Sequence, residues 1–233
     1  MLIALFVFSL LVLGFIGLAD QVAEGETRKM DERLFLLLHE DDGTPVGPAW
    51  VEEVGRDATA LGGNTILTLF ALAVFGYLGL NQRWKDAVII AISVIGGVIV
   101  SLLLKEVFDR PRPDLVPHLS HTLTSSFPSG HSMLAAVTYL TLGALVAEMA
   151  ERKRQIVYPL VVALLLTVMV GVSRVHVGVH WPTDVLGGWM MGAAWALLCW
   201  SVIRWLQRHR ALTGRREGGG DPMEQNRLTA DEE

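Results

Sequence analysis

The sequence has 233 residues, of which 52% are hydrophobic and 18% are charged, with a formal net charge of −5 at pH 7. Soluble domains have about 25% charged residues, so this charged fraction is low for a soluble domain of this size. The six long stretches without charge that are described next exclude a soluble enzyme, a nucleic-acid-binding domain and a disordered scaffold. The single cysteine, Cys199, excludes an intramolecular disulfide and a CxxC zinc site.

Six stretches of the chain contain no Asp, Glu, Lys or Arg, and each is close to the length that crosses a membrane. A helix needs roughly 20 apolar residues to span a hydrocarbon core about 30 Å thick. We therefore predict an all-α fold, a polytopic bundle of six transmembrane helices. The stretches are Met1–Ala19, Ala58–Gln82, Ala87–Leu104, Ser132–Ala147, Gln155–Ser173 and Val185–Ile203.

A long polar segment, Asp20–Asp57, follows the first predicted span. Within it, Arg33–His39 is too short to span and has charged flanks, so we predict an extra interfacial helix here, which could line a lateral entry to a site. Residues 1–210 are predicted to form one membrane domain. The tail, 211–233, has a Gly-Gly-Gly run and an acidic end, and is predicted to be disordered.

The distribution of Lys and Arg predicts the orientation. An even number of spans places both termini on one side, and that side holds eleven of the 19 Lys and Arg residues. The positive-inside rule therefore places both termini in the cytoplasm and the opposite loops on the outer face. The compact size and the absence of an Asn-x-Ser/Thr sequon favour a bacterial inner (plasma) membrane.

Ionisable residues cluster on this outer face at helix ends, where they are costly unless they pair or line a cavity. Lys105, Arg112 and Arg174 are three cations from two loops, and such a set suits an anion with several oxygens. Arg110 and the Arg28-Lys29 pair are further cations that would suit a diphosphate, although single charges discriminate weakly.

Two short motifs add groups that suit phosphate chemistry. Ser129-Gly130-His131 begins the fourth span, so its free backbone N–H groups and the helix dipole offer an anion site. Asp184 follows His180 by four residues and could hold one ring nitrogen protonated, leaving the other as nucleophile or base. Because no DxD or HExxH motif occurs, we predict phosphoryl transfer through a histidine, with a second histidine as acid or base.

Each feature also has a structural interpretation. Lys105 alone could be a lysine that snorkels at a helix end, and Pro128–His131 alone could be a turn with an N-cap. His180 with Asp184 could be a pair that stabilises a helix start. Their convergence on one face favours a functional site. The other histidines are interpreted as polar loop groups: His118, His121, His176 and His209.

At these residues the sequence resembles the type 2 phosphatidic acid phosphatase superfamily, the lipid phosphate phosphatases. Its first motif, Lys, six residues, then Arg-Pro, is met by Lys105 and Arg112-Pro113. Its second, Pro-Ser-Gly-His, is met by Pro128–His131. Its third, Ser-Arg, five residues, His, three residues, Asp, is met by Ser173-Arg174, His180 and Asp184. No motif position departs from the pattern.

The resemblance implies a membrane hydrolase that releases phosphate from a lipid mono- or diphosphate through a phosphohistidine, with no metal and no organic cofactor. It implies that His180 attacks phosphorus, Asp184 orients its ring, and His131 protonates the leaving oxygen and then activates water. It also implies that the equatorial oxygens are held by Lys105, Arg112, Arg174 and the N–H groups of Ser129 and Gly130.

The expected partners are the lipid phosphate and bilayer lipids, with no nucleic acid and no obligate protein partner. The expected substrates are undecaprenyl diphosphate, phosphatidate and phosphatidylglycerol phosphate, and we favour the first or a broad range. Three alternatives stay open: a lipid phosphotransferase with the same site, a vanadium haloperoxidase, and a non-enzymatic anion-binding membrane protein. Haloperoxidases share the motifs but are soluble, which the six predicted spans disfavour.

Overall fold

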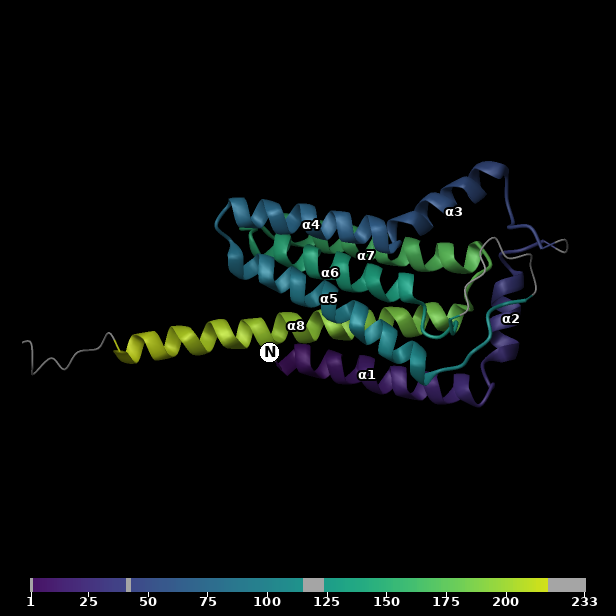
Figure 1. The fold of residues 1–233 in the computed structure, drawn as a ribbon, viewed down its shortest axis with the longest axis horizontal. Helices are drawn as coiled ribbons and strands as arrows, with labels where there is room; N and C mark the ends of the chain where they lie inside the picture. Colours follow the sequence, from purple (N-terminus) through teal and green to yellow (C-terminus); the bar gives the residue numbers. More distant parts are fainter. Residues whose placement is uncertain (1, 41–42, 115–123, 218–233) are drawn as a thin grey trace, which may run out of the picture.

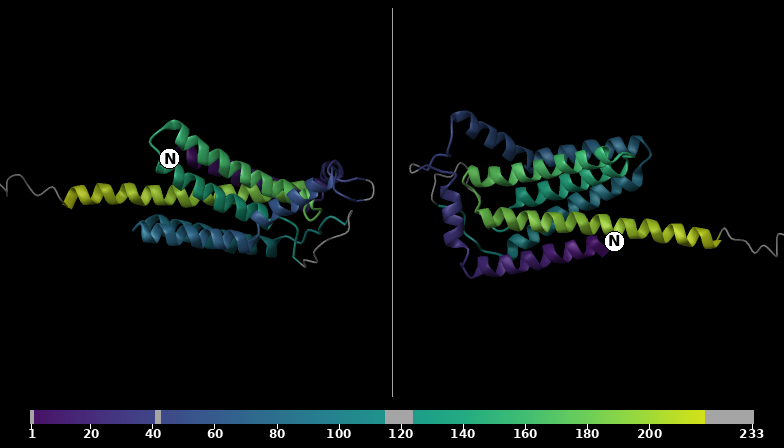
Figure 2. Two further views of the ribbon diagram at one scale, coloured as in Figure 1. Left: turned by 90° about the horizontal axis from the view of Figure 1, so that it is seen from above. Right: turned by 180° about the vertical axis from the view of Figure 1, so that it is seen from behind.

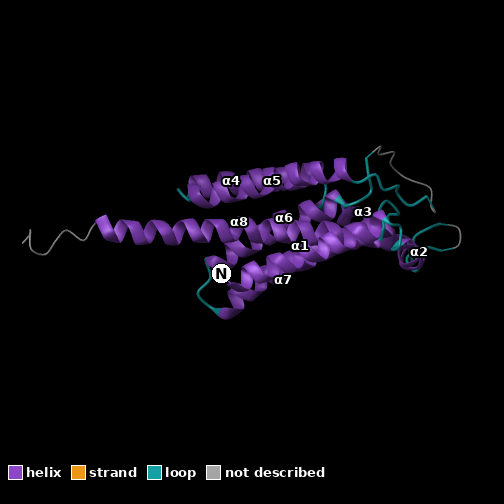
Figure 3. Cartoon of the chain, turned by 90° about the horizontal axis from the view of Figure 1, so that it is seen from below, coloured by secondary structure: helices purple, strands orange, loops and turns teal. Residues whose placement is uncertain are grey.

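The computed structural model describes residues 2–40, 43–114 and 124–217, and this part of the chain consists of helices and loops without a strand (Figure 1 and Figure 3). The helices form an elongated bundle with two shorter helices at one end (Figure 1). In chain order they are α1 (Leu2–Ala23), α2 (Arg28–Leu36), α3 (Ala49–Leu61), α4 (Asn64–Leu80), α5 (Trp84–Val107), α6 (Gly130–Glu148), α7 (Lys153–His176) and α8 (Pro182–Glu217).

Five of these described helices, α1, α5, α6, α7 and α8, are long and apolar enough to cross a membrane. α3 and α4 together make a sixth span, bent by 52° at the break between them. The predicted six-span all-α bundle is confirmed with this refinement, since the stretch Ala58–Gln82 is divided between two helices. α3 was not predicted as a helix because its exposed face is charged, with an ion pair of 2.8 Å between Glu52 and Arg56.

The predicted interfacial helix is present as α2, but it covers Arg28–Leu36 instead of Arg33–His39. α2 lies across the end of the bundle in Figure 1 and is seen nearly end-on in Figure 3. Its inward face buries Phe35 against Trp181, with 5.6 Å between ring centroids. Leu37, just beyond the helix, is 72% exposed, as expected of an apolar residue at a membrane surface.

α6 lies at the centre of the bundle, and α8 approaches its first turns closely. A Cβ atom at Gly188 would lie 2.6 Å from the carbonyl oxygen of Ser129, and one at Gly192 would lie 2.5 Å from that of Met133. Glycines four residues apart allow two membrane helices to pack backbone against backbone. This contact fixes the start of α8 beside the start of α6.

The start of α1 and the end of α8 point to the same end of the bundle, opposite α2 and α3 (Figures 1 and 2). This agrees with an even number of membrane crossings. That this end of the bundle faces the cytoplasm stays a prediction. α8 continues to Glu217, past residue 211, where the disordered tail was predicted to begin. The run from 211 to 217 lacks proline and so can extend the helix, and residues 218–233 lie outside the described part.

Candidate active site

The turn between α7 and α8 positions His180. Gly178 takes a φ of 77°, a left-handed conformation that glycine adopts without steric cost, and the chain reverses there. His180 is 2% exposed, and its Nδ1 lies 3.3 Å from Oδ2 of Asp184. The same Oδ2 accepts the Trp181 backbone N–H at 2.9 Å. With Nδ1 facing the carboxylate, Nε2 is the ring nitrogen left for chemistry.

Burial lowers the pKa of His180 from its ordinary value of 6.5 to about 4. The hydrogen bond and the charge of Asp184 oppose this shift, while the positive charges of Arg174 and Arg112 add to it. The ring is therefore neutral at neutral pH, which is the state that a nucleophile or a base requires.

A cavity of about 200 Å³ opens beside His180 and collects residues from six segments of the chain. α5 contributes Lys105, the loop after it contributes Arg112, and α7 contributes Arg174. Gly130 and His131 come from the first turn of α6. The structure thus brings together the predicted cations, the two predicted histidines and the predicted glycine.

The three cations that line the cavity have few partners within the described part of the chain, and none of them forms an ion pair there. The buried Nε of Arg174 has no hydrogen-bond partner among the described residues. Lys105 reaches Thr124 at 3.5 Å, and Arg112 donates to the Val179 carbonyl at 3.0 Å and to the Thr124 carbonyl at 3.4 Å. Burial lowers the pKa of Arg112. A buried donor without an acceptor is rare, so the Arg174 guanidinium favours the binding of an anion in this cavity.

Ser129 differs from its predicted role. Its backbone N–H donates to the Asp184 carbonyl oxygen at 2.9 Å, and its hydroxyl accepts a hydrogen bond from Ser132 at 3.0 Å. The side chain is fully buried. Ser129 therefore joins α6 to α8 and does not line the cavity, which leaves the first N–H groups of α6, at Gly130 and His131, to face it.

Sequence reasoning missed a buried network behind His180. Arg110, which was counted among the cations for a diphosphate, donates to Asp184 at 2.5 Å and to Asp31 of α2 at 2.6 Å. Both carboxylates are fully buried, and the Arg110 side chain is 11% exposed. No α2 residue is among the described residues that line the cavity, and the role of this helix at a lateral entry stays a prediction. Asp31 had no sequence signal, since it lies among several charged residues.

The remaining histidines either lie away from the cavity or belong to the residues that the structure does not describe. His39 stacks on Phe35, with ring centroids 4.1 Å apart. His176 faces α3, where a Cβ at Gly55 would lie 2.6 Å from its ring. His118 and His121 lie outside the described residues, as does the side chain of His209. Among the described residues, no group of three or more His, Cys, Asp or Glu side chains is placed to hold a metal ion.

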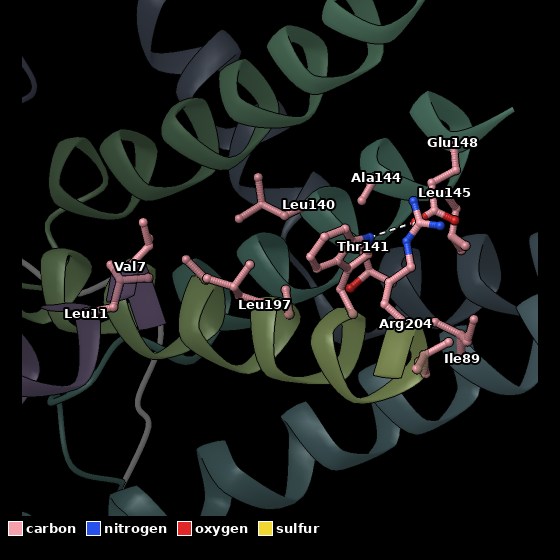
Figure 4. A pocket seen from close by; sticks show the side chains of 14 residues that line it. Val7, Leu11, Ile89, Leu140, Thr141, Ala144, Leu145, Glu148, Leu197 and Arg204 are labelled. Carbon is pink, nitrogen blue, oxygen red and sulfur yellow. Dashed lines mark hydrogen bonds and ion pairs between the residues drawn. The ribbon is translucent and has the colours of Figure 1, made fainter. Parts of the chain in front are cut away.

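A second cavity, of about 330 Å³, lies toward the other end of the bundle, between α1, α5, α6 and α8 (Figure 4). Its walls are apolar, with Leu140, Leu145 and Leu197 among the lining residues. One ion pair, Glu148 with Arg204 at 3.0 Å, lies at its edge. No histidine is among the described residues that line this cavity, and its carboxylate, Glu148, is paired with Arg204. The cavity beside His180 is therefore the better candidate for the chemistry.

Known proteins resemble the chain over most of this bundle. A model described as the PAP2 superfamily matches residues 86–208. Phosphatidylglycerophosphatase B of Bacillus subtilis (strain 168) is 35% identical over 147 residues, covering 61% of this chain and 70% of the relative. Undecaprenyl-diphosphatase BcrC of the same strain is 39% identical over 128 residues, covering 52% of this chain and 58% of the relative.

A solved structure has the same arrangement of helices. It is that of a transmembrane PAP2-type phosphatidylglycerolphosphate phosphatase from Bacillus subtilis, which superimposes with a TM-score of 0.76 at 28% identity. The match covers 84% of this chain and 94% of that one.

Proposed function

The chain belongs to the PAP2 superfamily, and from this premise we propose that it hydrolyses lipid phosphates through a phosphohistidine on His180, without a metal ion. The observation that carries the proposal is the pairing of one neutral, buried histidine with three cations that have no carboxylate partner in the described part of the chain. The cations supply positive charge for a phosphate, and the histidine supplies the nucleophile.

In the first step, Nε2 of His180 forms a bond to phosphorus as the bond from phosphorus to the lipid oxygen breaks. Asp184 stabilises the positive charge that develops on the ring through its contact with Nδ1. Lys105, Arg112 and Arg174 stabilise the charge on the equatorial oxygens, together with the N–H groups that begin α6. His131 gives its proton to the departing lipid oxygen.

In the second step, His131 takes a proton from water, and the water oxygen bonds to phosphorus as the bond to Nε2 breaks. Inorganic phosphate leaves and both histidines return to their starting states. Spontaneous hydrolysis of phosphate monoesters is so slow that enzymes reach accelerations of about 10²¹-fold, which explains the concentration of positive charge.

We propose that the lipid tail lies along α4 and α5. The site cavity is lined on one side by Val98, Leu102 and Leu134, which are apolar. An apolar cavity of about 290 Å³ between α4 and α5 shares Val98 with it. A tail in this groove would keep its contact with the bilayer while the phosphate reaches His180.

The proposed substrates are phosphatidylglycerol phosphate and undecaprenyl diphosphate, on which the named relatives act, with phosphatidate as a third candidate. We further propose a bacterial inner membrane, with both termini in the cytoplasm and the site on the outer face. The charge distribution of the loops supports this orientation.

The proposal is tested by phosphate release from these three lipids by detergent-purified protein in the presence of EDTA. We expect release that survives the chelator, with relative rates that identify the substrate. His180→Ala removes the nucleophile and should reduce the rate by roughly 10⁴–10⁶-fold. His176→Gln is the matched control, because this histidine lies outside the cavity. Equal rates in wild type and His180→Ala would refute the mechanism.

A further inference from the structure

Asp31 of α2 is a fully buried carboxylate that the proposed reaction does not use. Its Oδ2 accepts a hydrogen bond from the Thr183 hydroxyl at 2.7 Å, and its Oδ1 accepts the Thr183 backbone N–H at 3.0 Å. Thr183 lies in the first turn of α8, one residue before Asp184. A charge this deeply buried destabilises the fold unless it is paired, so its partners define what it does.

The charged partner of Asp31 is Arg110, and Arg110 connects it to Asp184. One terminal nitrogen of the guanidinium, Nη2, donates to Oδ2 of Asp31 at 2.6 Å. The other, Nη1, donates to Oδ1 of Asp184 at 2.5 Å. The second oxygen of Asp184 faces Nδ1 of His180. A continuous polar chain therefore runs from α2 through the loop after α5 to the ring of His180.

The division of the Arg110 fork between two carboxylates has a consequence for His180. A guanidinium beside a single carboxylate tends to bind both of its oxygens side-on. Here Asp31 holds one arm of the fork away, so Arg110 takes only one oxygen of Asp184 and the other stays with His180. If Asp31 lost its charge, Arg110 could turn to take both oxygens and compete with the imidazole.

We propose that Asp31 is a positioning residue, which acts through Arg110 to keep one oxygen of Asp184 on His180. α2 is then part of the catalytic apparatus although none of its residues is among those that line the cavity. This inference rests on the proposed function, because it concerns the rate at which His180 is phosphorylated. It assigns no substrate contact to Asp31, so substrate affinity should not depend on it.

The test compares kcat and KM of purified variants on whichever lipid the wild type hydrolyses. Asp31→Asn keeps the shape and an acceptor for Thr183 but loses the charge. We expect kcat to fall on the order of 10–100-fold with KM within about twofold, as for a displaced reacting group. Glu32→Gln is the matched control: it removes the next carboxylate on α2, which is exposed and pairs with Arg28 within the helix. Its kcat should equal that of the wild type.

A second substitution separates positioning from a structural role. Lysine has a single ammonium and cannot bind two carboxylate oxygens side-on as arginine does. In the Asp31→Asn background, Arg110→Lys should therefore raise kcat above that of Asp31→Asn alone. A structural defect would instead become worse with a second substitution in the network. The Thr183 hydroxyl donates to Asp31 at 2.7 Å and accepts from Nη1 of Arg110 at 2.8 Å. Thr183→Val removes both of these bonds and leaves the charges in place, so it should show a smaller kcat loss of the same kind.

Three results would overturn the inference: kcat in folded Asp31→Asn and Thr183→Val equal to that of Glu32→Gln, a rise in KM with unchanged kcat, or a double variant slower than Asp31→Asn. Size-exclusion chromatography and melting temperature identify the variants that fold. If Asp31→Asn does not fold, the kcat of Thr183→Val tests the inference in its place. Failure of the proposed function looks different, since the wild type itself would then release no phosphate from any of the lipids.

Discussion

The two ends of the bundle both pair arginine with a carboxylate, but in different surroundings. At the end that holds α2, Asp31 and Asp184 are fully buried on either side of Arg110. At the other end, Glu148 and Arg204 form one ion pair, with side chains that are 26% and 44% exposed. Trp200 donates to Glu148 at 2.7 Å, and its ring lies 5.5 Å from the Arg204 guanidinium.

The difference lies in the balance of charge. Glu148 and Arg204 satisfy each other at the edge of an apolar cavity, so this pair leaves no excess charge to attract a further ion. At the α2 end, the two buried carboxylates are engaged with Arg110 and His180, while three more cations line the cavity. Excess positive charge that is buried at Arg174 and half-buried at Lys105 and Arg112 favours the binding of an anion, and this separates a site from a structural ion pair.

The largest effect that sharpens this comparison is expected at Arg174. Arg174→Gln removes the charge and the donors that have no partner among the described residues. We expect kcat/KM for lipid phosphate hydrolysis to fall by roughly 10²–10³-fold, as when one donor to a developing negative charge is lost. Arg174→Lys should give an intermediate loss, because lysine keeps the charge without the planar fork. Arg204→Gln is the matched control, and equal losses in the two glutamine variants would contradict the comparison.

The protonation of His180 offers a second test. Because burial lowers its pKa to about 4, the ring gains a proton only as the pH falls toward that value and stays neutral above it. An exposed histidine would already be mostly protonated below pH 6.5. The charge and hydrogen bond of Asp184 raise the pKa of His180, so Asp184→Asn should lower it further.

The measurement is a pH titration of ¹⁵N-histidine resonances in detergent micelles, with the His180 signal identified by its absence in His180→Ala. A midpoint close to 6.5 would show that the ring is not held in a dry, positively charged site. An upward shift in Asp184→Asn would contradict the stated role of Asp184.

The smallest effect is expected at the other end of the bundle. Glu148→Gln and Arg204→Gln break a partly exposed pair, and such pairs contribute about 0–1 kcal/mol to the free energy of unfolding. We expect phosphate release within about twofold of the wild type and a small change in melting temperature. A large loss of activity in either variant would show that this ion pair affects the site at the other end, and would contradict its assignment as a structural pair.

The spans and the residues around the cavity could be predicted because their signals are local. A stretch without charges identifies a membrane helix, and the fixed spacing of Lys105, Arg112, Arg174 and His180 identifies the loops that meet. The two loops had to emerge on the same face because an even number of crossings separates them. The uncharged stretches and the number of membrane crossings were therefore sufficient to predict the spans and the residues that meet at the cavity.

The network behind His180 could not be predicted, because it depends on contacts between distant segments. Asp31 and Thr183 are 152 positions apart, and Asp31 is one of several acids in a polar segment. Whether Arg110 faces the cavity or a buried carboxylate depends on how α2 packs. The backbone bond from Ser129 to Asp184 likewise depends on the close approach of α6 and α8.

The measurement that tests the account most directly is rapid acid-free quenching of the enzyme with a lipid substrate ³²P-labelled on its terminal phosphate, in the presence of EDTA. We predict a protein-bound label that is stable in base and lost in acid, as expected of a phosphohistidine, and that is absent in His180→Ala. His131→Asn should retain the label for longer, because activation of water would be slowed. Steady phosphate release without any labelled protein, or a label that persists in His180→Ala, would contradict the account.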